Sequence, residues 1–147
     1  MLDAMSSSGI PSSLAALLPS PPTTYRTPKG TIHLWESKNV LVTCVEDLLT
    51  VEAAQAIETA TRRLVSRGGS HIQFHDWHAM TDYDSAARAR LTTFAIDRAK
   101  NIAALHMFAS VTVVRLAVKA ASLAIRNLRM HDERGSFDGE LRRALEA

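Results

Sequence analysis

The sequence predicts an α/β domain, a sandwich in which four helices pack on a mixed sheet of about five strands. Short β-branched runs alternate along the chain with longer segments whose apolar residues recur at helical spacing. Turn signals such as Gly68-Gly69 separate the two kinds of segment. The chain has 147 residues, 46% of them hydrophobic, which suffices for one buried core, so we expect a single domain.

The first predicted elements are two antiparallel strands that form a hairpin. Apolar and polar residues alternate over residues 31–35, residues 37–39 have the composition of a turn, and a β-branched run occupies residues 40–45. An amphipathic helix is predicted over residues 50–67, where apolar residues recur at helical spacing and charged residues fall on the other side. Thr50 is its predicted N-cap, and Gly68-Gly69 its predicted stop.

The rest of the chain continues the alternation of strands and helices. Strands are predicted at residues 71–75, 102–108 and 128–131. A helix opened by Asp84 or Ser85 follows the first of these strands. Its predicted inner face carries Ala87, Leu91, Phe94 and Ala95.

The last two predicted helices differ in character. The helix over residues 111–126 is apolar almost all round, which indicates burial within the protein or beneath a partner chain. The terminal helix carries Phe137 and Leu141 and takes Ser136 as its predicted cap.

Residues 1–28 have a composition unlike the rest of the chain. They are rich in Ser, Pro and Thr with few large hydrophobic residues, so we expect a flexible tail, and a domain over residues 29–147. The alternative is a docking segment, because residues 13–18 are able to form one or two amphipathic turns. We expect neither a secretory signal nor a membrane span, since the longest apolar piece of this segment is only residues 14–18.

Charge and cysteine content narrow the classes of function. The net charge is +2, charged residues make up 22%, and no run of Lys or Arg exceeds two residues, which argues against nucleic acid as a partner. The single cysteine, Cys44, lies in the apolar run of residues 40–45, where a small core residue is expected rather than a nucleophile. We therefore expect a cytoplasmic protein.

The stretch from Phe74 to Ser85, FHDWHAMTDYDS, concentrates acids, aromatic rings and a hydroxyl after a predicted strand. Ligands and partners of open α/β sheets are met outside the carboxyl ends of strands, so we expect the functional surface here. The candidate partner-binding residues are Asp76, Trp77, Asp82, Tyr83, Asp84, Ser85 and Arg88.

Metal binding and catalysis are both weakly indicated by this stretch. His71 and His75 on one strand would lie about 13 Å apart, too far for one ion, so no metal site is expected. His75 or His78 with Ser85 and a nearby acid offers the residue types of a hydrolase, but neither a G-x-S-x-G elbow nor a Gly-rich phosphate loop accompanies them. We expect a protein that is not an enzyme and has no cofactor.

The order of elements and the central motif resemble the STAS domains of anti-sigma-factor antagonists. In those domains an apolar strand ends in Asp, and after a loop an Asp-Ser-Ser-Gly step opens the next helix. Here the strand ends at Phe74-His-Asp76, residues 77–83 form the expected loop, and the helix opens with Asp84-Ser85-Ala86-Ala87. The resemblance covers residues from about 30 to 147 and is strongest to a bacterial STAS-like subgroup with the FHDW and TDYDS motifs.

This resemblance implies a position for a regulatory phosphate. In the signalling members a kinase phosphorylates the second Ser of Asp-Ser-Ser-Gly, which places charge at a helix N-terminus. Ala86 occupies that position here, so the usual serine switch is expected to be absent. Ser85 is then either the helix cap or a phosphorylation site shifted by one position.

The function that the resemblance implies is a non-catalytic regulatory or scaffolding module that binds another protein. The partner would be a kinase or an anti-sigma-type regulator, and the apolar helix over residues 111–126 would support a homo-oligomer. Trp77 and Tyr83 serve in this hypothesis as interface anchors or as a lid on the sheet, and Asp82 and Asp84 pair with Arg88 or Arg90. The alternative is a small-molecule or lipid carrier with an apolar pocket beside that helix.

Overall fold

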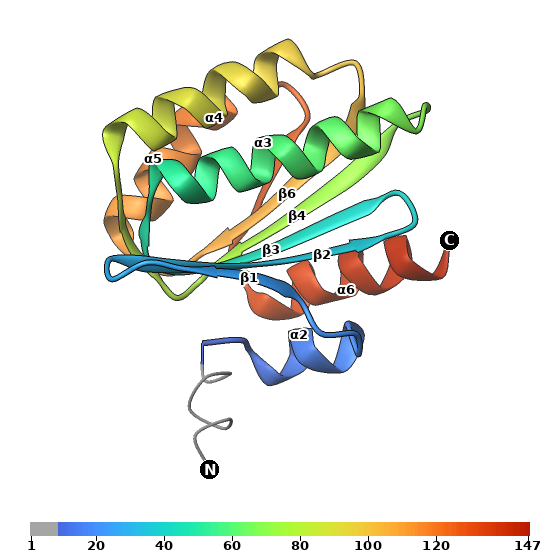
Figure 1. Ribbon diagram of the computed structural model, residues 1–147, viewed down its shortest axis with the longest axis horizontal. Helices are drawn as coiled ribbons and strands as arrows, with labels where there is room; N and C mark the ends of the chain where they lie inside the picture. Colours follow the sequence, from blue (N-terminus) through green and yellow to red (C-terminus); the bar gives the residue numbers. More distant parts are fainter. Residues whose placement is uncertain (1–8) are drawn as a thin grey trace.

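The computed structural model describes residues 9–147, which form a mixed sheet with helices on both faces (Figure 1). The strand order is β1-β2-β3-β4-β6-β7, and β5 pairs with β3 beside this path. The strands are β1 (Thr23–Arg26), β2 (Gly30–Ser37), β3 (Val40–Leu49), β4 (His71–Trp77), β5 (Met80–Tyr83), β6 (Ile102–Ala109) and β7 (Leu128–His131). The helices are α2 (Ser12–Leu17), α3 (Val51–Ser66), α4 (Ser85–Asp97), α5 (Thr112–Ser122) and α6 (Arg134–Glu146).

The predicted fold class is confirmed, with small differences in number. Over residues 9–147 the sheet has seven strands rather than about five, because β1 and β5 add to the predicted set. The same residues contain five helices rather than four, since α2 lies where a tail was expected.

The sheet combines an antiparallel and a parallel half. The hairpin of β2 and β3 is antiparallel, as predicted. β1 pairs with the outer edge of β2 and is also antiparallel to it. Strands β3, β4, β6 and β7 run parallel, so each connection between them crosses a face of the sheet through a helix.

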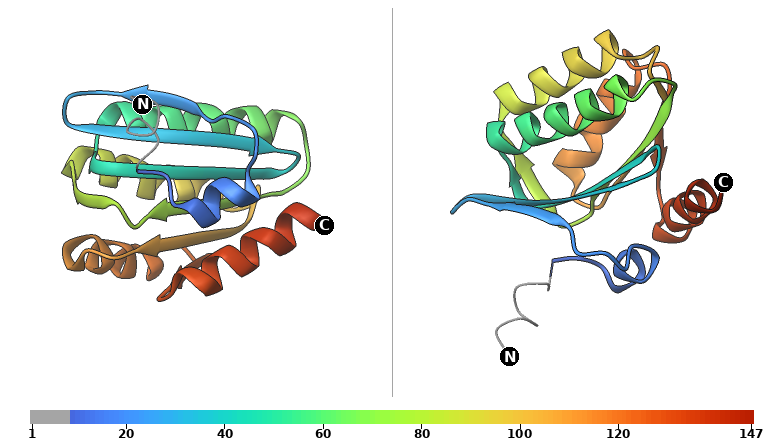
Figure 2. Two further views of the ribbon diagram at one scale, coloured as in Figure 1. Left: turned by 90° about the horizontal axis from the view of Figure 1, so that it is seen from below. Right: turned by 45° about the vertical axis from the view of Figure 1, so that its right-hand side comes forward.

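The helices divide between the two faces of the sheet (Figure 2). Helices α3, α4 and α5 lie over one face, where Ile57, Leu64 and Val118 join the larger core. Helices α2 and α6 lie under the other face, where Leu14 and Phe137 join a smaller core. The chain is therefore a three-layer sandwich with the sheet in the middle.

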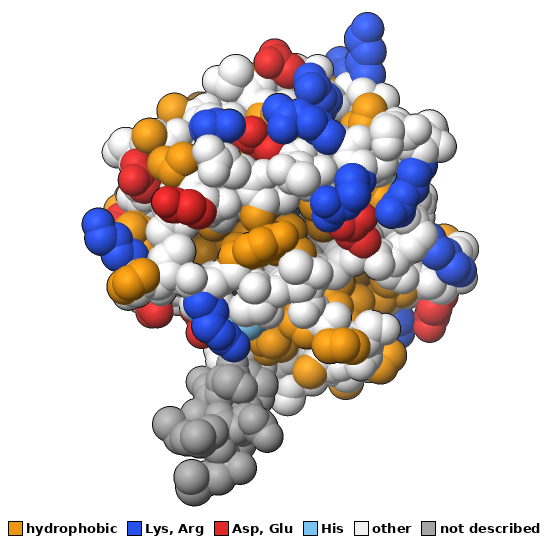
Figure 3. Space-filling view, in the orientation of Figure 1, with side chains coloured by type: hydrophobic (Ala, Val, Ile, Leu, Met, Phe, Trp, Pro, Cys, Tyr) orange, Lys and Arg blue, Asp and Glu red, His pale blue; other side chains and the backbone are white. Residues whose placement is uncertain are grey.

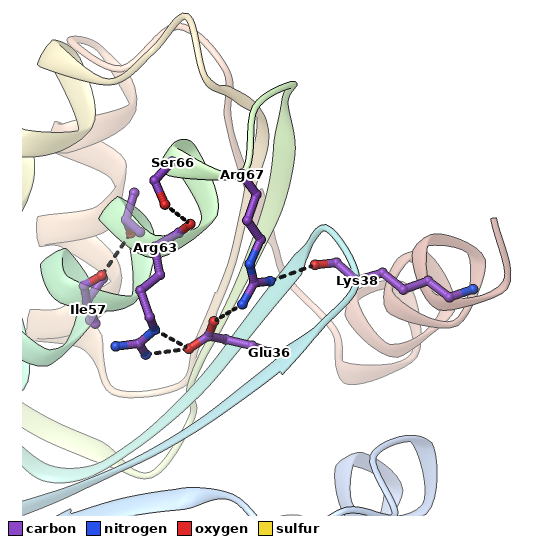
Figure 4. A network of polar contacts seen from close by, with 7 residues as sticks. Glu36, Lys38, Ile57, Arg63, Ser66 and Arg67 are labelled. Carbon is purple, nitrogen blue, oxygen red and sulfur yellow. Dashed lines mark hydrogen bonds and ion pairs between the residues drawn. The ribbon is translucent and has the colours of Figure 1, made fainter.

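Helix α3 begins and ends as the sequence predicted. The Thr50 hydroxyl accepts a hydrogen bond from the Ala53 amide at 3.1 Å, which caps the first turn. The chain leaves the helix through Gly68 and Gly69, whose φ angles of +85° and +75° favour glycine. The last turns are tied to the β2–β3 hairpin by Arg63 and Arg67, which both contact the Glu36 carboxylate (Figure 4).

The expectation of a flexible tail over residues 1–28 is wrong for residues 9–28. Leu14 and Leu18 are buried against α6 and the lower face of the sheet, and β1 pairs with β2 along its whole length. The Trp35 indole N–H donates to the Ser20 carbonyl at 3.0 Å, which fixes the connection between α2 and β1. Residues 1–8, to which the same expectation applied, lie outside the described residues.

Two further expectations about the C-terminal half need correction. The terminal helix starts at Arg134, before its predicted cap, and the Ser136 hydroxyl instead forms a hydrogen bond of 2.6 Å with His131. Helix α5 is not buried on all sides by its own chain, because Val113 and Leu116 are exposed, as is Leu123 directly after it.

Candidate functional site

The segment expected to be a loop at residues 77–83 is mostly strand. β4 continues to Trp77, and after a turn at residues 78–79 the chain resumes as β5, parallel to the end of β3. The register of this pairing shifts between Asp47, which pairs with Met80, and Leu48, which pairs with Asp82, so the extra residue lies in β5. Asp47 has a φ of +66° at this point. Because side chains alternate along a strand, the residues of the motif are divided between the two faces of the sheet.

Asp76 faces α6 and takes no part in an exposed surface. Its carboxylate is fully buried and accepts a hydrogen bond from Arg134 at 2.8 Å and another from the His78 amide at 3.2 Å. The Arg134 guanidinium also lies 4.9 Å from the centre of the Phe108 ring. Asp76 is therefore a structural anchor between β4 and the first turn of α6.

Trp77 faces the opposite way, toward α4 and α5. Its side chain is 8% exposed and belongs to the larger core, which rules out an exposed interface anchor. The indole N–H is buried and finds no hydrogen-bond acceptor among residues 9–147. Of the two roles considered for Trp77, the structure favours the packed one.

Trp77 lines a cavity between the sheet and the three upper helices. The space measures about 70 Å³. Its floor comes from β4 and β6, and its walls from the helices. Among the lining residues are Gln73 and His75 of β4, Leu105 and Met107 of β6, Leu91 and Ala95 of α4, Val118 and Ala121 of α5, and Ile57 of α3.

A buried network of polar side chains forms part of the cavity floor. The Gln73 amide donates to Thr61 at 3.0 Å and to His71 at 2.9 Å, and its carbonyl oxygen accepts from His75 at 2.8 Å. Thr43 completes the chain with a hydrogen bond of 2.6 Å to the second ring nitrogen of His75. Both nitrogens of His75 are thus engaged by neighbouring side chains.

This network is neutral. Burial, and to a lesser degree the neighbouring His71, lower the pKa of His75 to about 3. Burial also lowers the pKa of His71. Neutral His75 donates through Nε2 and accepts from the Thr43 hydroxyl at Nδ1, which agrees with the distances.

Helix α4 covers the cavity but is weakly attached to the body. Only Ala87 among its residues is buried, whereas α3 buries seven. Arg90 holds α4 to α3 by hydrogen bonds of 2.7 and 3.1 Å to the Glu58 carboxylate, and Arg62 lies 5.2 Å from the centre of the Phe94 ring. Leu91, Phe94 and Ala95 of the predicted inner face line the cavity, and Leu91 and Ala95 also pack against the larger core.

The start of α4 carries the exposed part of the predicted site. The Asp84 carboxylate accepts the Ala86 amide at 2.9 Å, so Asp84 rather than Ser85 is the cap. Asp82 accepts the amide of Tyr83 at 2.8 Å, and Arg88 lies over the Tyr83 ring, 5.7 Å from its centre. The predicted pairing of Asp82 and Asp84 with Arg88 or Arg90 is therefore not observed.

The seven predicted site residues are thus separated into three groups. Asp76 lies under the sheet. Trp77, Tyr83 and Arg88 line the cavity above it, and the exposed residues are Asp82, Asp84 and Ser85. Gln73 was not among the predicted site residues, although the polar residues at 71, 73 and 75 share one face of a strand and indicate a buried network.

The residue types considered for catalysis or metal binding do not assemble into one site. Both ring nitrogens of His75 are occupied, while Ser85 lies on the surface at the start of α4. His78 Nδ1 lies 3.5 Å from the Asp76 carboxylate, without hydrogen-bond geometry. Within residues 9–147 no group of three metal-ligating side chains gathers.

The molecular surface adds two observations. On the face shown in Figure 3, basic side chains alternate with acidic ones and form no continuous basic stripe. Across residues 9–147, every helix is too short or too polar to cross a membrane.

Comparison with known proteins establishes the fold. No protein-family model matches the chain, and no curated protein matches it in sequence. Among solved structures, the fold matches that of an uncharacterized protein of the DUF3478 family, with a SpoIIAA-like fold, from Shewanella loihica PV-4. The two share 11% sequence identity with a TM-score of 0.57, over 80% of this chain and 97% of that chain. The chain therefore has the SpoIIAA-like fold, that of the STAS-like domains, as the motif predicted.

Proposed function

We propose that this protein is a non-catalytic, cytoplasmic binding module whose cavity holds an apolar small molecule or lipid. The cavity beneath α4 carries the proposal, because it is lined mainly by apolar side chains with a small number of polar groups on its floor. Binding sites for small molecules are commonly apolar cavities of about 300–1,000 Å³ with such polar groups. This cavity is smaller, at about 70 Å³, so a ligand would enlarge it by displacing α4. This is the carrier alternative of the sequence analysis.

The attachment of α4 supports the same proposal. A helix that buries one residue is able to move away from the sheet at low cost, since little apolar area is lost. Such a helix admits a ligand without unfolding the two cores. The hydrogen bonds of His75 and Gln73 are satisfied within the floor, so this part of the cavity presents a neutral surface to the ligand.

Native mass spectrometry of freshly purified protein tests the proposal. We expect a reproducible mass above that of the bare chain, lost when the cavity is filled by the Ala117→Phe substitution. Ala120→Phe is the matched control, because Ala120 is on the exposed side of the same helix. If several preparations of the unmodified chain showed only the mass of the chain itself, that result would contradict the carrier function.

Protein docking at the start of α4 is the second candidate function. Asp82, Asp84 and Ser85 are exposed there, and α5, which packs beside β5, extends the surface with exposed Val113 and Leu116. This surface combines carboxylates with apolar side chains, as protein interfaces do. The candidate partners are a kinase, an anti-sigma-type regulator or a second copy of this chain.

A pull-down with a purified candidate partner tests the docking function. Asp84→Lys should abolish capture, while Asp97→Lys, an exposed site in the last turn of the same helix, should leave it unchanged. Trp77→Ala is unsuitable as a test because Trp77 is buried. Equal capture by both variants, with unchanged circular dichroism, would exclude this surface.

Ser85 is also a candidate phosphorylation site. Asp84 supplies the cap, so no capping role occupies the exposed Ser85 hydroxyl. A phosphate there would add negative charge at the N-terminus of α4, beside the docking surface. Phosphopeptide mapping after incubation with the partner kinase tests this, and phosphate found only at other residues would contradict it.

A further inference from the structure

The cavity has chemically different ends. Trp77, Tyr83 and Arg88 lie where β4 and β5 end and α4 begins. Ile102 and Leu128 lie where β6 and β7 begin. Because β4, β6 and β7 run parallel, these two groups lie at opposite edges of the sheet. One end of the cavity is therefore polar and the other apolar.

The polar end contains a hydrogen-bond donor that the protein itself does not use. The Trp77 indole N–H is buried and has no acceptor among the described residues. The other polar groups of the floor differ, since Gln73 and His75 bond to one another and to Thr61 and Thr43. Leaving a buried donor unpaired is unfavourable, and an oxygen atom of a ligand would offset that cost.

The polar end also contains a cation without a carboxylate partner. Arg88 is half-buried, lines the cavity and lies over the Tyr83 ring, but within residues 9–147 it forms no ion pair. The nearest candidate acids are engaged elsewhere, because Asp82 and Asp84 accept backbone amides. A guanidinium in this position is suited to a carboxylate or a phosphate, which it binds through parallel hydrogen bonds.

We propose that the ligand is an amphiphile with an apolar chain and an anionic oxygen headgroup, and that its headgroup lies between Trp77 and Arg88. With α4 displaced outward to make room, the chain would run along the floor toward Ile102 and Leu128, over a distance of about 13 Å if it follows β4 from Gln73 to Trp77. This inference rests on the carrier function proposed above and adds the headgroup chemistry and the direction of the ligand.

Calorimetric titration with decanoate, decyl phosphate and decanol tests the headgroup. We expect decanoate or decyl phosphate to bind at least about tenfold more tightly than decanol, and Arg88→Gln to remove that difference. Arg98→Gln is the matched control, because Arg98 follows the other end of α4 and lies over the Phe94 ring. It should leave the affinity for decanoate unchanged.

The indole N–H resonances report directly on the position of the headgroup. The chain has two tryptophans, and Trp35 already donates to Ser20, so its ¹⁵N–¹H signal should remain in place when decanoate is added. The Trp77 signal, assigned with Trp77→Phe, should shift. Arg88→Lys keeps the charge and should partly retain the preference for the anion, provided that circular dichroism shows intact folding of each variant.

The outcomes separate this inference from the function on which it rests. Equal affinity for decanol and decanoate, unaffected by Arg88→Gln, would overturn the headgroup assignment and leave the carrier function in place. No binding of any of the three probes, although native mass spectrometry finds a bound mass, would also overturn the assignment alone. If none of the three probes binds and native mass spectrometry shows only the mass of the chain itself, both the headgroup assignment and the carrier function are overturned.

Discussion

Asp76 of β4 and Arg134 of α6 form an ion pair of 2.8 Å across 58 residues of sequence. The pair lies under the sheet, where the carboxylate is fully buried and the guanidinium is in partial contact with water. It fixes the first turn of α6 against the end of β4. The next residue of β4, Trp77, lines the cavity on the other face of the sheet. The strand thus joins the C-terminal helix to the proposed binding site.

Removal of Arg134 should destabilise the fold strongly. Arg134→Ala would leave the Asp76 carboxylate buried with only the His78 amide as donor, a loss of about 3 kcal/mol or more in the free energy of unfolding. Urea denaturation followed by circular dichroism measures it. Arg143→Ala is the control, since its pair with Glu140 is on the surface of the same helix and should contribute less than about 1 kcal/mol. Equal midpoints for the two variants would contradict the structural role of Asp76.

Stability should fall as the pH is lowered from about 6.5 toward 4. Burial lowers the pKa of His75 to about 3, and burial together with His131 lowers that of His106 to about 4. Both pKa values lie below the value of about 6.5 expected in the unfolded chain, so the unfolded chain takes up more protons in this interval. Stability is therefore complete above pH 6.5 and is lost as the pH falls toward the folded values, by at most about 1.4 kcal/mol per pH unit for each histidine.

Urea denaturation at several pH values between 7.5 and 4.5 measures this dependence. His106→Gln should reduce the slope of unfolding free energy against pH. His78→Gln is the control for loss of a histidine in a turn, where the side chain is 38% exposed. An unchanged slope in His106→Gln would contradict the assignment of the pH dependence to this residue.

The sequence predicted elements whose signals are local, and failed where distant contacts decide. The periodicity of residues 50–67 and the Thr50 cap were sufficient for α3, because amphipathic spacing and capping act within a few residues. Residues 9–28 were expected to be a tail on composition, yet Leu14 and Leu18 are buried by α6, which lies more than 110 residues away. No local pattern contains that contact.

The same limit explains what was predicted of the candidate site. The motif at residues 74–85 correctly located the carboxyl ends of strands, with Asp76 at the end of one, but Trp77 was expected to begin a loop. Because β4 continues to residue 77, these adjacent side chains point to opposite faces, one to α6 and one to the cavity. The strand was predicted to end at residue 75 or 76 and ends at residue 77. Residues expected on a docking surface are therefore a structural anchor, Asp76, and part of the cavity wall, Trp77.

Gly30 should be intolerant of a side chain. A Cβ atom at this position would lie 2.1 Å from the Leu48 carbonyl oxygen, because β2 and β3 approach closely where Gly30 pairs with Asp47. Gly30→Ala should destabilise the protein by about 1–3 kcal/mol. Gly139→Ala is the matched control: no atom lies within 4 Å of its Cβ in α6, so it should stabilise by about 0.5–1 kcal/mol. Thermal denaturation of both variants decides, and a neutral Gly30→Ala would contradict the close approach.

Helix α4 should open independently of the rest of the upper layer. It buries one residue where α3 buries seven, so its amide hydrogens should exchange with solvent at least about 100-fold faster than those in the middle of α3. Hydrogen exchange followed by mass spectrometry measures both helices in one experiment. Glu58→Gln weakens the contact with Arg90 and should accelerate exchange in α4 while leaving α6, on the other face of the sheet, unchanged. If α4 and α3 are equally protected in the ligand-free chain, α4 is a fixed part of the core, and a ligand must enter the cavity by another route.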